Sequence, residues 1–407
     1  MSLRISTNSI YESGTSQLNT LQGQMAKTQN QLSTNKRMLT AADDPIASAR
    51  ALEVTQSQAL NTQYSTNRAN AGSSLSMVES AISNGADLVM DVQTLVVQAG
   101  NGTLSKSDRL QIATEIEGRM QDLLGIANTS DGTGGYLFSG YKGTTVPFLQ
   151  TDSGATYQGD QGQRKLQVGS SRSVAISDSG SSIFENNRTG NGSYQTTMVD
   201  GNKGGAVAGS GSVTDASKLT GHNYSLEFKV DGDKTTYTVT DNSTTPKKAV
   251  LSDEPYVAGK QIAFDGASFS ITGAPANGDK FEVKPSEKES IFTTLTSLVS
   301  ALRASGEDKT SLATLSNKLN TASEGLKSSL DNILKVSASF GSRMKELDYL
   351  DSSGSDLGIQ YDATLSKLQD LDMVKAISQY ATQQQTLEAA QKSFKTMSGL
   401  SLFNYIG

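Results

Sequence analysis

The chain has 407 residues, of which 35% are hydrophobic and 6% aromatic, with a net charge of −6 and no tryptophan. This length allows two or three domains, but the low apolar content argues against one thick core. Long amphipathic helices with a glycine-rich β part fit better. Binders of nucleic acid or anionic membranes need clustered lysine and arginine, and the sequence has no such run. We therefore expect no nucleic acid and no membrane among its partners.

Side chains that usually carry chemistry are scarce. The sequence has no cysteine and one histidine, His222, which excludes disulfides, thiol catalysis and cysteine-bound zinc. No acidic or second histidine partner is apparent near His222, so we interpret it as a surface residue. We expect no cofactor, no metal and no enzymatic activity. Polar residues throughout Met1–Tyr11 predict neither a cleavable signal peptide nor a membrane span, so secretion would use another route.

The first helical pattern runs to about residue 39. Its seam positions alternate in spacing between three and four, as in a coiled coil. They are Tyr11, Gly14, Leu18, Leu21, Met25, Thr28, Leu32, Asn35 and Leu39. Glycine, threonine and asparagine stand where leucine or isoleucine would be expected, so this helix should be marginal alone. It needs a partner.

The segment Leu39–Pro45 is predicted to break this helix. Proline disfavours helix at the residue before it and is favoured in the first turn of a new one. Asp43 and Asp44 precede Pro45, and Asp44 is a natural N-cap. A second helix is predicted over about 46–99 and a third from about Ser105 to just before Asn128.

Residues 131 to 288 have a different character, rich in glycine, serine, threonine and aspartate. Short apolar alternations flank Asp231-Gly232 and Asp265-Gly266, which is typical of β-hairpins. A glycine-, serine- and asparagine-rich stretch, Asn187–Ser212, is a soft boundary between two β parts.

Helical spacing returns after Ser290. A short helix is expected to stop near Ser305-Gly306, and a long seam follows from Leu312 to Leu350. Asp351–Gly354 is predicted to interrupt it. A final helix is predicted over Tyr361–Met397.

These elements predict an α+β fold. We expect an elongated multi-helix, coiled-coil-like stalk formed by the N- and C-terminal segments, with an inserted β-rich outer domain of one or two subdomains. The expected division is a terminal helical assembly domain of 1–45 and 358–407, a long-helix stalk domain of 46–131 and 289–357, and an outer domain of 132–288. A self-contained bundle with an inserted β domain remains the alternative on periodicity alone.

The candidate functional residues are those of the terminal seams, proposed to pair in an assembly interface. On the N-terminal side they are Leu18, Leu21, Met25, Leu32 and Leu39. On the C-terminal side they are Ile377, Tyr380, Leu387, Phe394 and Met397. The helix break and cap are assigned to Asp43, Asp44 and Pro45.

Motifs at both ends of the chain resemble bacterial flagellins and their junction relatives. At the N-terminal end they are Arg4-Ile5-Ser6-Thr7, Leu32-Ser33-Thr34-Asn35-Lys36-Arg37 and Ala42-Asp43-Asp44-Pro45. At the C-terminal end they are Asp370-Leu371-Asp372-Met373, Gln383-Gln384-Gln385 and Ser401-Leu402-Phe403-Asn404-Tyr405-Ile406. Asn35 stands where the superfamily usually has glycine, a mild change because asparagine also tolerates tight backbone.

Two further motifs resemble the hook-associated protein 3 branch of that superfamily. They are Gly135-Tyr136-Leu137-Phe138-Ser139-Gly140, leading to Pro147-Phe148, and Tyr157-Gln158-Gly159-Asp160. The resemblance implies a secreted structural subunit that joins hook to filament outside the cell. It also implies type III export in unfolded form, a homo-oligomer in the flagellar axial structure, contacts with hook-associated protein 1 and flagellin, and an export chaperone bound to the C-terminal segment. The alternatives are a flagellin filament subunit or a surface-displayed glycan- or host-binding module.

Overall fold

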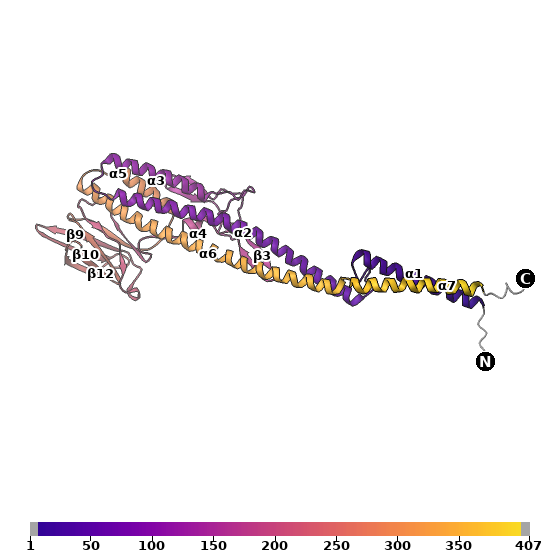
Figure 1. Cartoon of the computed structure of the whole chain (residues 1–407). Coiled ribbons are helices and arrows are strands. Elements are labelled where there is room, and N and C mark those ends of the chain that lie inside the picture. Colours follow the sequence, from indigo (N-terminus) through magenta and orange to yellow (C-terminus); the bar gives the residue numbers. More distant parts are fainter. Residues whose placement is uncertain (1–6, 400–407) are drawn as a thin grey trace, which may run out of the picture. The chain divides into compact units, whose positions relative to one another are not determined.

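Figure 1 shows the computed structural model, which describes residues 7–399. The chain forms two compact units. One contains the described residues before Asn67 and after Tyr349, and the other is Asn67–Tyr349. Two long helices, α2 (Pro45–Ala99) and α6 (Lys309–Gln369), contribute residues to both. Each unit has its own packing.

The first unit is built from helices at the two ends of the chain. α1 (Thr7–Thr34) and α7 (Met373–Gly399) lie side by side, and the unit also contains the first turns of α2 and the last turns of α6. Between α2 and α6, Asn61 Nδ2 donates a hydrogen bond of 2.7 Å to the carbonyl of Gly354. The prediction of an α+β fold with helices from opposite ends packed together is confirmed.

The helix break predicted at Asp351–Gly354 is wrong, because α6 continues through it to Gln369. Gly354 is buried and accepts the bond from Asn61, so packing overrides the poor helix propensity of serine and glycine here. The chain instead turns at residues 370–372. There Asp372 Oδ1 accepts a 3.0 Å hydrogen bond from the amide of Lys375 and caps α7.

Four helical segments form the body of the second unit: the later part of α2, α3 (Lys106–Ala127), α5 (Ile291–Ala304) and the first part of α6. Burial of each large apolar side chain contributes roughly 1.5–3 kcal/mol. The buried set includes Leu75, Val78, Ile82, Val89, Val92, Ile112, Ile116, Leu123, Phe292, Leu295, Leu298, Leu302, Leu319, Leu326, Ile333 and Phe340. These side chains form the core of the second unit, although the low apolar content had argued against a thick core.

Two hairpins and a short helix precede the outer sheets in the chain, and the first hairpin and the short helix contribute to an aromatic cluster. These elements are β1 (Phe148–Thr151), β2 (Gly154–Tyr157), β3 (Lys165–Gly169), β4 (Arg172–Ala175) and α4 (Gly180–Phe184). Phe148 lies with its ring centroid 5.7 Å from Phe184 and 5.2 Å from Phe292. Gly154 has φ of 123°, and a Cβ there would stand 2.7 Å from the Phe292 carbonyl carbon. Only glycine therefore lets the hairpin approach α5 so closely.

Two antiparallel sheets form the outer part of this unit. The five-stranded sheet has the order β11 (Lys248–Pro255), β10 (Lys234–Asp241), β9 (Tyr224–Asp231), β14 (Lys280–Pro285) and β6 (Tyr194–Met198). The other contains β12 (Gln261–Phe264), β13 (Ala267–Thr272) and β7 (Val207–Ala208), with β8 (Ser212–Val213) also pairing with β13. A short 3₁₀ turn, Ala216–Lys218, precedes β9. Both predicted hairpins are present, as β9 with β10 and β12 with β13.

His222 differs from the sequence interpretation, because it does have an acidic partner. Its Nδ1 lies 2.7 Å from Oδ2 of Asp241, whose side chain is buried at the end of β10. The two residues are 19 positions apart, and only the β9–β10 hairpin brings them together. Burial opposes ionisation of Asp241, but hydrogen bonds from His222 and from the Ser243 amide lower its pKa overall.

Asparagine side chains of α6 attach the outer sheets to the helices. Asn317 is buried, with Nδ2 donating to the carbonyl of Ala206 over 2.9 Å and Oδ1 accepting from the amide of Ala208 over 2.9 Å. One turn later, Asn320 Nδ2 donates to the Ala208 carbonyl over 2.9 Å. The side chains thus satisfy the free edge of β7 as a further strand would.

The chain enters and leaves the outer sheets through a two-stranded ribbon, β5 (Asn187–Arg188) with β15 (Lys288–Glu289). Asn332 of α6 holds this entry point, since its Nδ2 donates to the carbonyls of Ser182 and Ile183, each over 2.9 Å. The two sheets are therefore an insertion whose ends are adjacent.

A buried arginine joins the two helix-connecting turns of the second unit. Arg109 follows the Ser105–Asp108 capping box that starts α3, and its side chain is 2% exposed. Its guanidinium donates to the carbonyls of Leu104 (2.7 Å) and Gly306 (2.9 Å) and to Ser305 Oγ (2.9 Å). Its charge therefore stabilises the α2–α3 turn and the α5–α6 turn at once.

We expect Arg109→Ala to lower the free energy of unfolding by about 2–3 kcal/mol, because it leaves a cavity and unpaired carbonyl oxygens. Urea unfolding followed by circular dichroism measures this. The matched control is Arg119→Ala on the same helix, whose partly exposed ion pair with Asp91 should contribute under about 0.5 kcal/mol. Equal losses in the two variants would contradict the role given to Arg109.

Candidate functional site

The paired helices α1 and α7 contain most of the seam residues singled out in the sequence. They run antiparallel, and a contact near one end of the pair defines their register. At one end the ring of Phe394 lies 5.0 Å from that of Tyr11 and covers Gly14, where a Cβ would stand 2.7 Å from the ring. Beyond the other end, in the turn after α1, the Arg37 amide donates to the carbonyl of Gln369, the last residue of α6, over 2.7 Å.

Between these anchors, large residues of one helix fall opposite small residues of the other. Counting along the two antiparallel helices from the contact of Gly14 with Phe394 brings Leu18 opposite Ala390 and Leu32 opposite Ala376. A large side chain of one helix that packs against a small residue of the other lets the two helices approach closely. Ala376 and Leu387 are buried on α7, whereas most of the surrounding residues are exposed. The pair thus has a core one side chain wide.

The structure places the seam residues of α1 as a half-buried stripe: Leu18, Leu21, Met25 and Leu32. Tyr380, Leu387 and Phe394 lie on the facing side of α7. Ile377 does not, since it is 56% exposed, and Met397 near the end of the helix is 48% exposed. Leu39 lies beyond the end of α1, in the turn that follows it. The pairing predicted for Ile377 and for Leu39 differs from the structure of the single chain.

Three residues on the inner face of α7 were missed: Ala376, Gln383 and Ala390. With Tyr380, Leu387 and Phe394 they complete an alternating spacing of four and three along the helix. The spacing was therefore present in the sequence. It was hidden because two positions carry alanine and one carries a polar side chain, while exposed Ile377 and Met397 are more hydrophobic.

The turn after α1 is held by side chains from the segment singled out as a break. Asn35 has φ of 54°, the left-handed conformation that asparagine tolerates better than other non-glycine residues. Asp44 Oδ1 accepts a 3.0 Å hydrogen bond from the Ala47 amide, which is the geometry of an N-cap, and Pro45 is the first residue of α2.

Asp43 ties this turn back to α1. Its carboxylate accepts hydrogen bonds from Lys27 Nζ (2.5 Å) and from the amides of Thr40 (3.0 Å) and Leu39 (2.9 Å). The bond from Lys27 above all, and then the two amide bonds, hold the pKa of Asp43 well below its usual range.

Of the two signature segments at the extreme ends of the chain, only Thr7 lies among the described residues. Residues Arg4–Ser6 and Ser401–Ile406 lie outside the described residues. Within residues 7–399, no group of three or more histidine, cysteine or acidic side chains is arranged to hold a metal ion. No helix of that range is long and apolar enough to cross a membrane.

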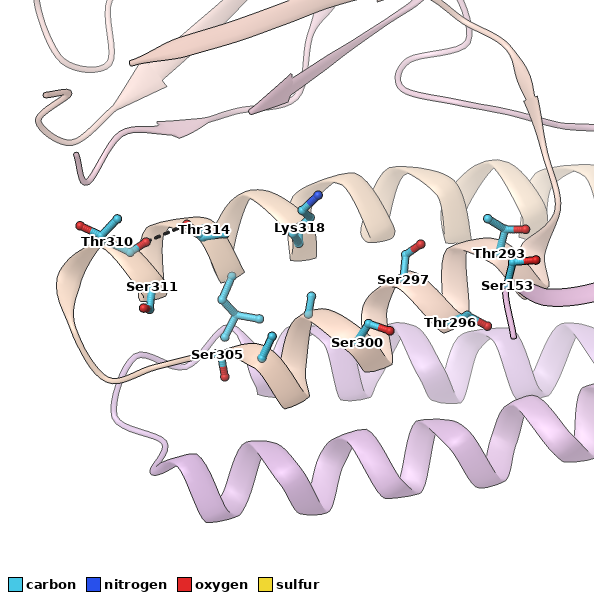
Figure 2. Close-up of a pocket in the computed structure, with 13 residues that line it drawn as sticks. Ser153, Thr293, Thr296, Ser297, Ser300, Ser305, Thr310, Ser311, Thr314 and Lys318 are labelled. Atoms are coloured by element: carbon cyan, nitrogen blue, oxygen red, sulfur yellow. Dashed lines mark hydrogen bonds between the residues drawn. The ribbon is translucent and has the colours of Figure 1, made fainter. Parts of the chain in front are cut away.

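A groove between α5 and α6 in the second unit is the other concave feature of interest (Figure 2). It measures about 500 Å³. Serine and threonine hydroxyls line most of it, and Lys318 is the one titratable side chain on its wall. A hydroxyl is a weak nucleophile without an adjacent base, so these walls supply no general acid–base pair.

Gly14→Ala tests the close approach of Phe394. Alanine favours an exposed helix over glycine by roughly 1 kcal/mol, and Gly23→Ala, where a Cβ meets nothing within 4 Å, should gain that amount. At Gly14 we expect no gain or a loss, because the new methyl displaces the ring. The thermal stability of the terminal helices in both variants is measured by monitoring hydrogen exchange as temperature rises. Equal stabilisation would show that the register does not depend on this contact.

The low pKa of Asp43 predicts a pH dependence. Folding favours its charged form, so its contribution is present above the unfolded pKa of about 4 and is lost as pH falls further. The stability difference between wild type and Asp43→Ala should be largest at pH 7 and shrink toward pH 3. Exposed Asp356→Ala should show the same small difference at both pH values. A difference for Asp43→Ala that stays constant with pH would contradict the assignment.

Comparison with known families gives two matches. Residues 5–143 match the bacterial flagellin N-terminal helical region. Residues 198–285, which form most of the outer sheets, match the D2-like domain of flagellar hook-associated protein 1.

Full-length relatives are more specific. Flagellar hook-associated protein 3 of Escherichia coli K12 is 31% identical over 405 residues, covering 98% of this chain and 99% of that protein. The crystal structure of flagellar hook-associated protein 3 from Legionella pneumophila has 30% identity and a TM-score of 0.74, covering 77% of this chain and 98% of that one. A structure of the flagellar junction protein FlgL from the same species has 30% identity and a TM-score of 0.72, covering 79% and 100%. The prediction of a structural, non-enzymatic flagellar subunit is thereby confirmed, and the chain belongs to the flagellar hook-associated protein 3 family.

Proposed function

We propose that this chain forms a layer of identical subunits between hook and filament, and that the α1·α7 pair is the element through which neighbouring copies pack. The observation that carries the proposal is the thinness of the pair. One line of side chains holds two helices of 28 and 27 residues together, and the rest of their surface is open. Helices with so little core normally gain stability from further packing.

The outer surface of α1 suits contact with other copies. Its only charged side chains are Glu12 and Lys27, while glutamine, asparagine, serine and threonine fill most other positions. Uncharged polar groups lose less on leaving water than charged ones do, and they exchange water for hydrogen bonds with a neighbour. A surface of this composition can be buried on assembly and still dissolve as a monomer.

Exposed apolar residues also gather in the first unit. Val374 and Ile377 form one patch at the start of α7, and Ile46 and Leu52 are exposed at the start of α2. Contiguous apolar surface on a soluble protein usually marks an interaction site. Ile377, which does not face α1 within the chain, is therefore placed to contact another subunit.

The wider set of partners follows from family membership. We infer hook-associated protein 1 on the hook side and flagellin on the filament side, and the likeness of residues 198–285 to a domain of hook-associated protein 1 supports a shared environment. We also propose secretion through the flagellar type III apparatus and a chaperone on the C-terminal segment before export. A chain without cysteine can be exported unfolded without disulfide chemistry.

The test is incorporation of a double variant, Val374→Glu with Ile377→Glu, into flagella. Both side chains are exposed, so the monomer should keep its circular dichroism spectrum. Incorporation should fall at least tenfold, because assembly would bury two carboxylates. Val97→Glu, at an equally exposed apolar site in the second unit, is the control. Normal incorporation of the double variant would sink the proposed interface.

Electron microscopy of a seeded reaction separates the junction role from that of a filament subunit. On purified hook fragments carrying hook-associated protein 1, wild-type protein should add a thin layer and stop. Growth of long filaments would instead assign this chain the role of a flagellin.

A further inference from the structure

One polar side chain, Gln383, interrupts the inner face of α7. It follows Tyr380 by three residues and precedes Leu387 by four, so it lies on the line of contact with α1. Counting along the two antiparallel helices from the Gly14–Phe394 contact brings Gln383 opposite Met25. Its Oε1 is buried and has no hydrogen-bond partner among the described residues.

The neighbours on α1 do not supply the missing donor. The thioether of Met25 has no hydrogen to donate. The hydroxyl of Thr28, one turn further along, donates its hydrogen to the Gln24 carbonyl over 3.0 Å. The facing backbone amides are committed to the helices themselves. Closing the pair therefore removes water from Oε1 without replacement, and opening the pair restores it.

We propose that Gln383 keeps the α1·α7 pair weak, so that the two ends of the chain separate and pair again easily. A buried acceptor without a donor penalises the closed state, whereas an apolar residue at the same position would add to the seam. A single polar residue in a helical seam is known to lower stability while leaving register defined. Here the contact of Phe394 with Gly14 defines the register of the pair.

The consequence concerns assembly, and this part rests on the proposed function. A pair that opens readily can rearrange as neighbouring copies cover it. A pair locked by an apolar seam would have to break first. Gln383 therefore sets the rate at which a monomer adopts its assembled packing.

The test compares Gln383→Leu with Gln384→Leu in the full-length chain. Gln384 is the exposed neighbour, and the two substitutions change composition and helix propensity equally. Hydrogen exchange of the α1 and α7 amides should slow at least tenfold in Gln383→Leu, because exchange follows the opening equilibrium, and should be unchanged in Gln384→Leu. Unchanged exchange in Gln383→Leu, or an equal slowing in both variants, would overturn the proposal.

A second variant gives a readout that improved packing alone would not. Gln383→Glu has nearly the same shape, but its carboxylate is charged at pH 7 and neutral at low pH. Protection of the α1 and α7 amides, corrected for intrinsic exchange, should fall at least tenfold below wild type at pH 7 and recover by pH 4. Protection that does not change with pH would mean that the side chain reaches water in the closed pair, contrary to the proposal.

Incorporation into flagella separates this inference from the proposed function. Gln383→Leu should incorporate several-fold more slowly than wild type and Gln384→Leu at the wild-type rate. Slower hydrogen exchange with normal incorporation would overturn the assembly role of Gln383. If wild-type protein itself failed to incorporate, the proposed function would fail, while the exchange results would still decide whether Gln383 weakens the pair.

Discussion

The first unit depends on a short backbone contact between two segments that are far apart in the sequence. The Arg37 amide donates to the Gln369 carbonyl, and the Leu371 amide donates to the Asn35 carbonyl. The Lys36 side chain also donates to the side chain of Gln369, 333 positions away in the sequence. Closing so long a loop is less costly than its length suggests, because the entropic cost of closure grows only with the logarithm of loop length. Packing of α2 against α6 lowers this entropic cost further, since the bond between Asn61 and Gly354 already brings the two chain segments together. Only the last short segments then remain to be joined.

The two compact units are stabilised in different ways. The second has many buried leucine, isoleucine, valine and phenylalanine side chains, and buried polar groups such as Arg109 and Asn317 fix its turns and its outer sheets. In the α1·α7 pair of the first unit, a single line of small and medium side chains replaces that core. Its specificity comes from shape, above all the Phe394 ring over Gly14, rather than from buried area. Stability and specificity are thus assigned to different parts of one chain.

Helix positions followed well from the sequence wherever spacing and caps agreed. Ser105 with Asp108 starts α3 where the pattern indicated, and Pro45 begins α2. The failures have a common cause in tertiary contacts. α6 continues through Ser352 and Ser353 because α2 packs against it, and His222 meets Asp241 only through strand pairing. Ala376 and Ala390 were overlooked because a seam that accepts large knobs from its partner needs small residues, which a search for hydrophobicity passes over.

The choice of small and polar residues in that seam explains why apolar residues such as Val374 and Ile377 lie outside it. A seam made of the most hydrophobic residues of α7 would bury them against α1 and leave a self-sufficient hairpin. Instead, Ala376, Gln383 and Ala390 face α1, while Val374 and Ile377 are exposed. Part of the apolar surface of α7 is therefore left uncovered in the single chain. Since hydrophobic burial scales with the area removed from water, the free energy kept in reserve becomes available only when another surface covers α7. An isolated chain that leaves this area open has a thermodynamic reason to assemble.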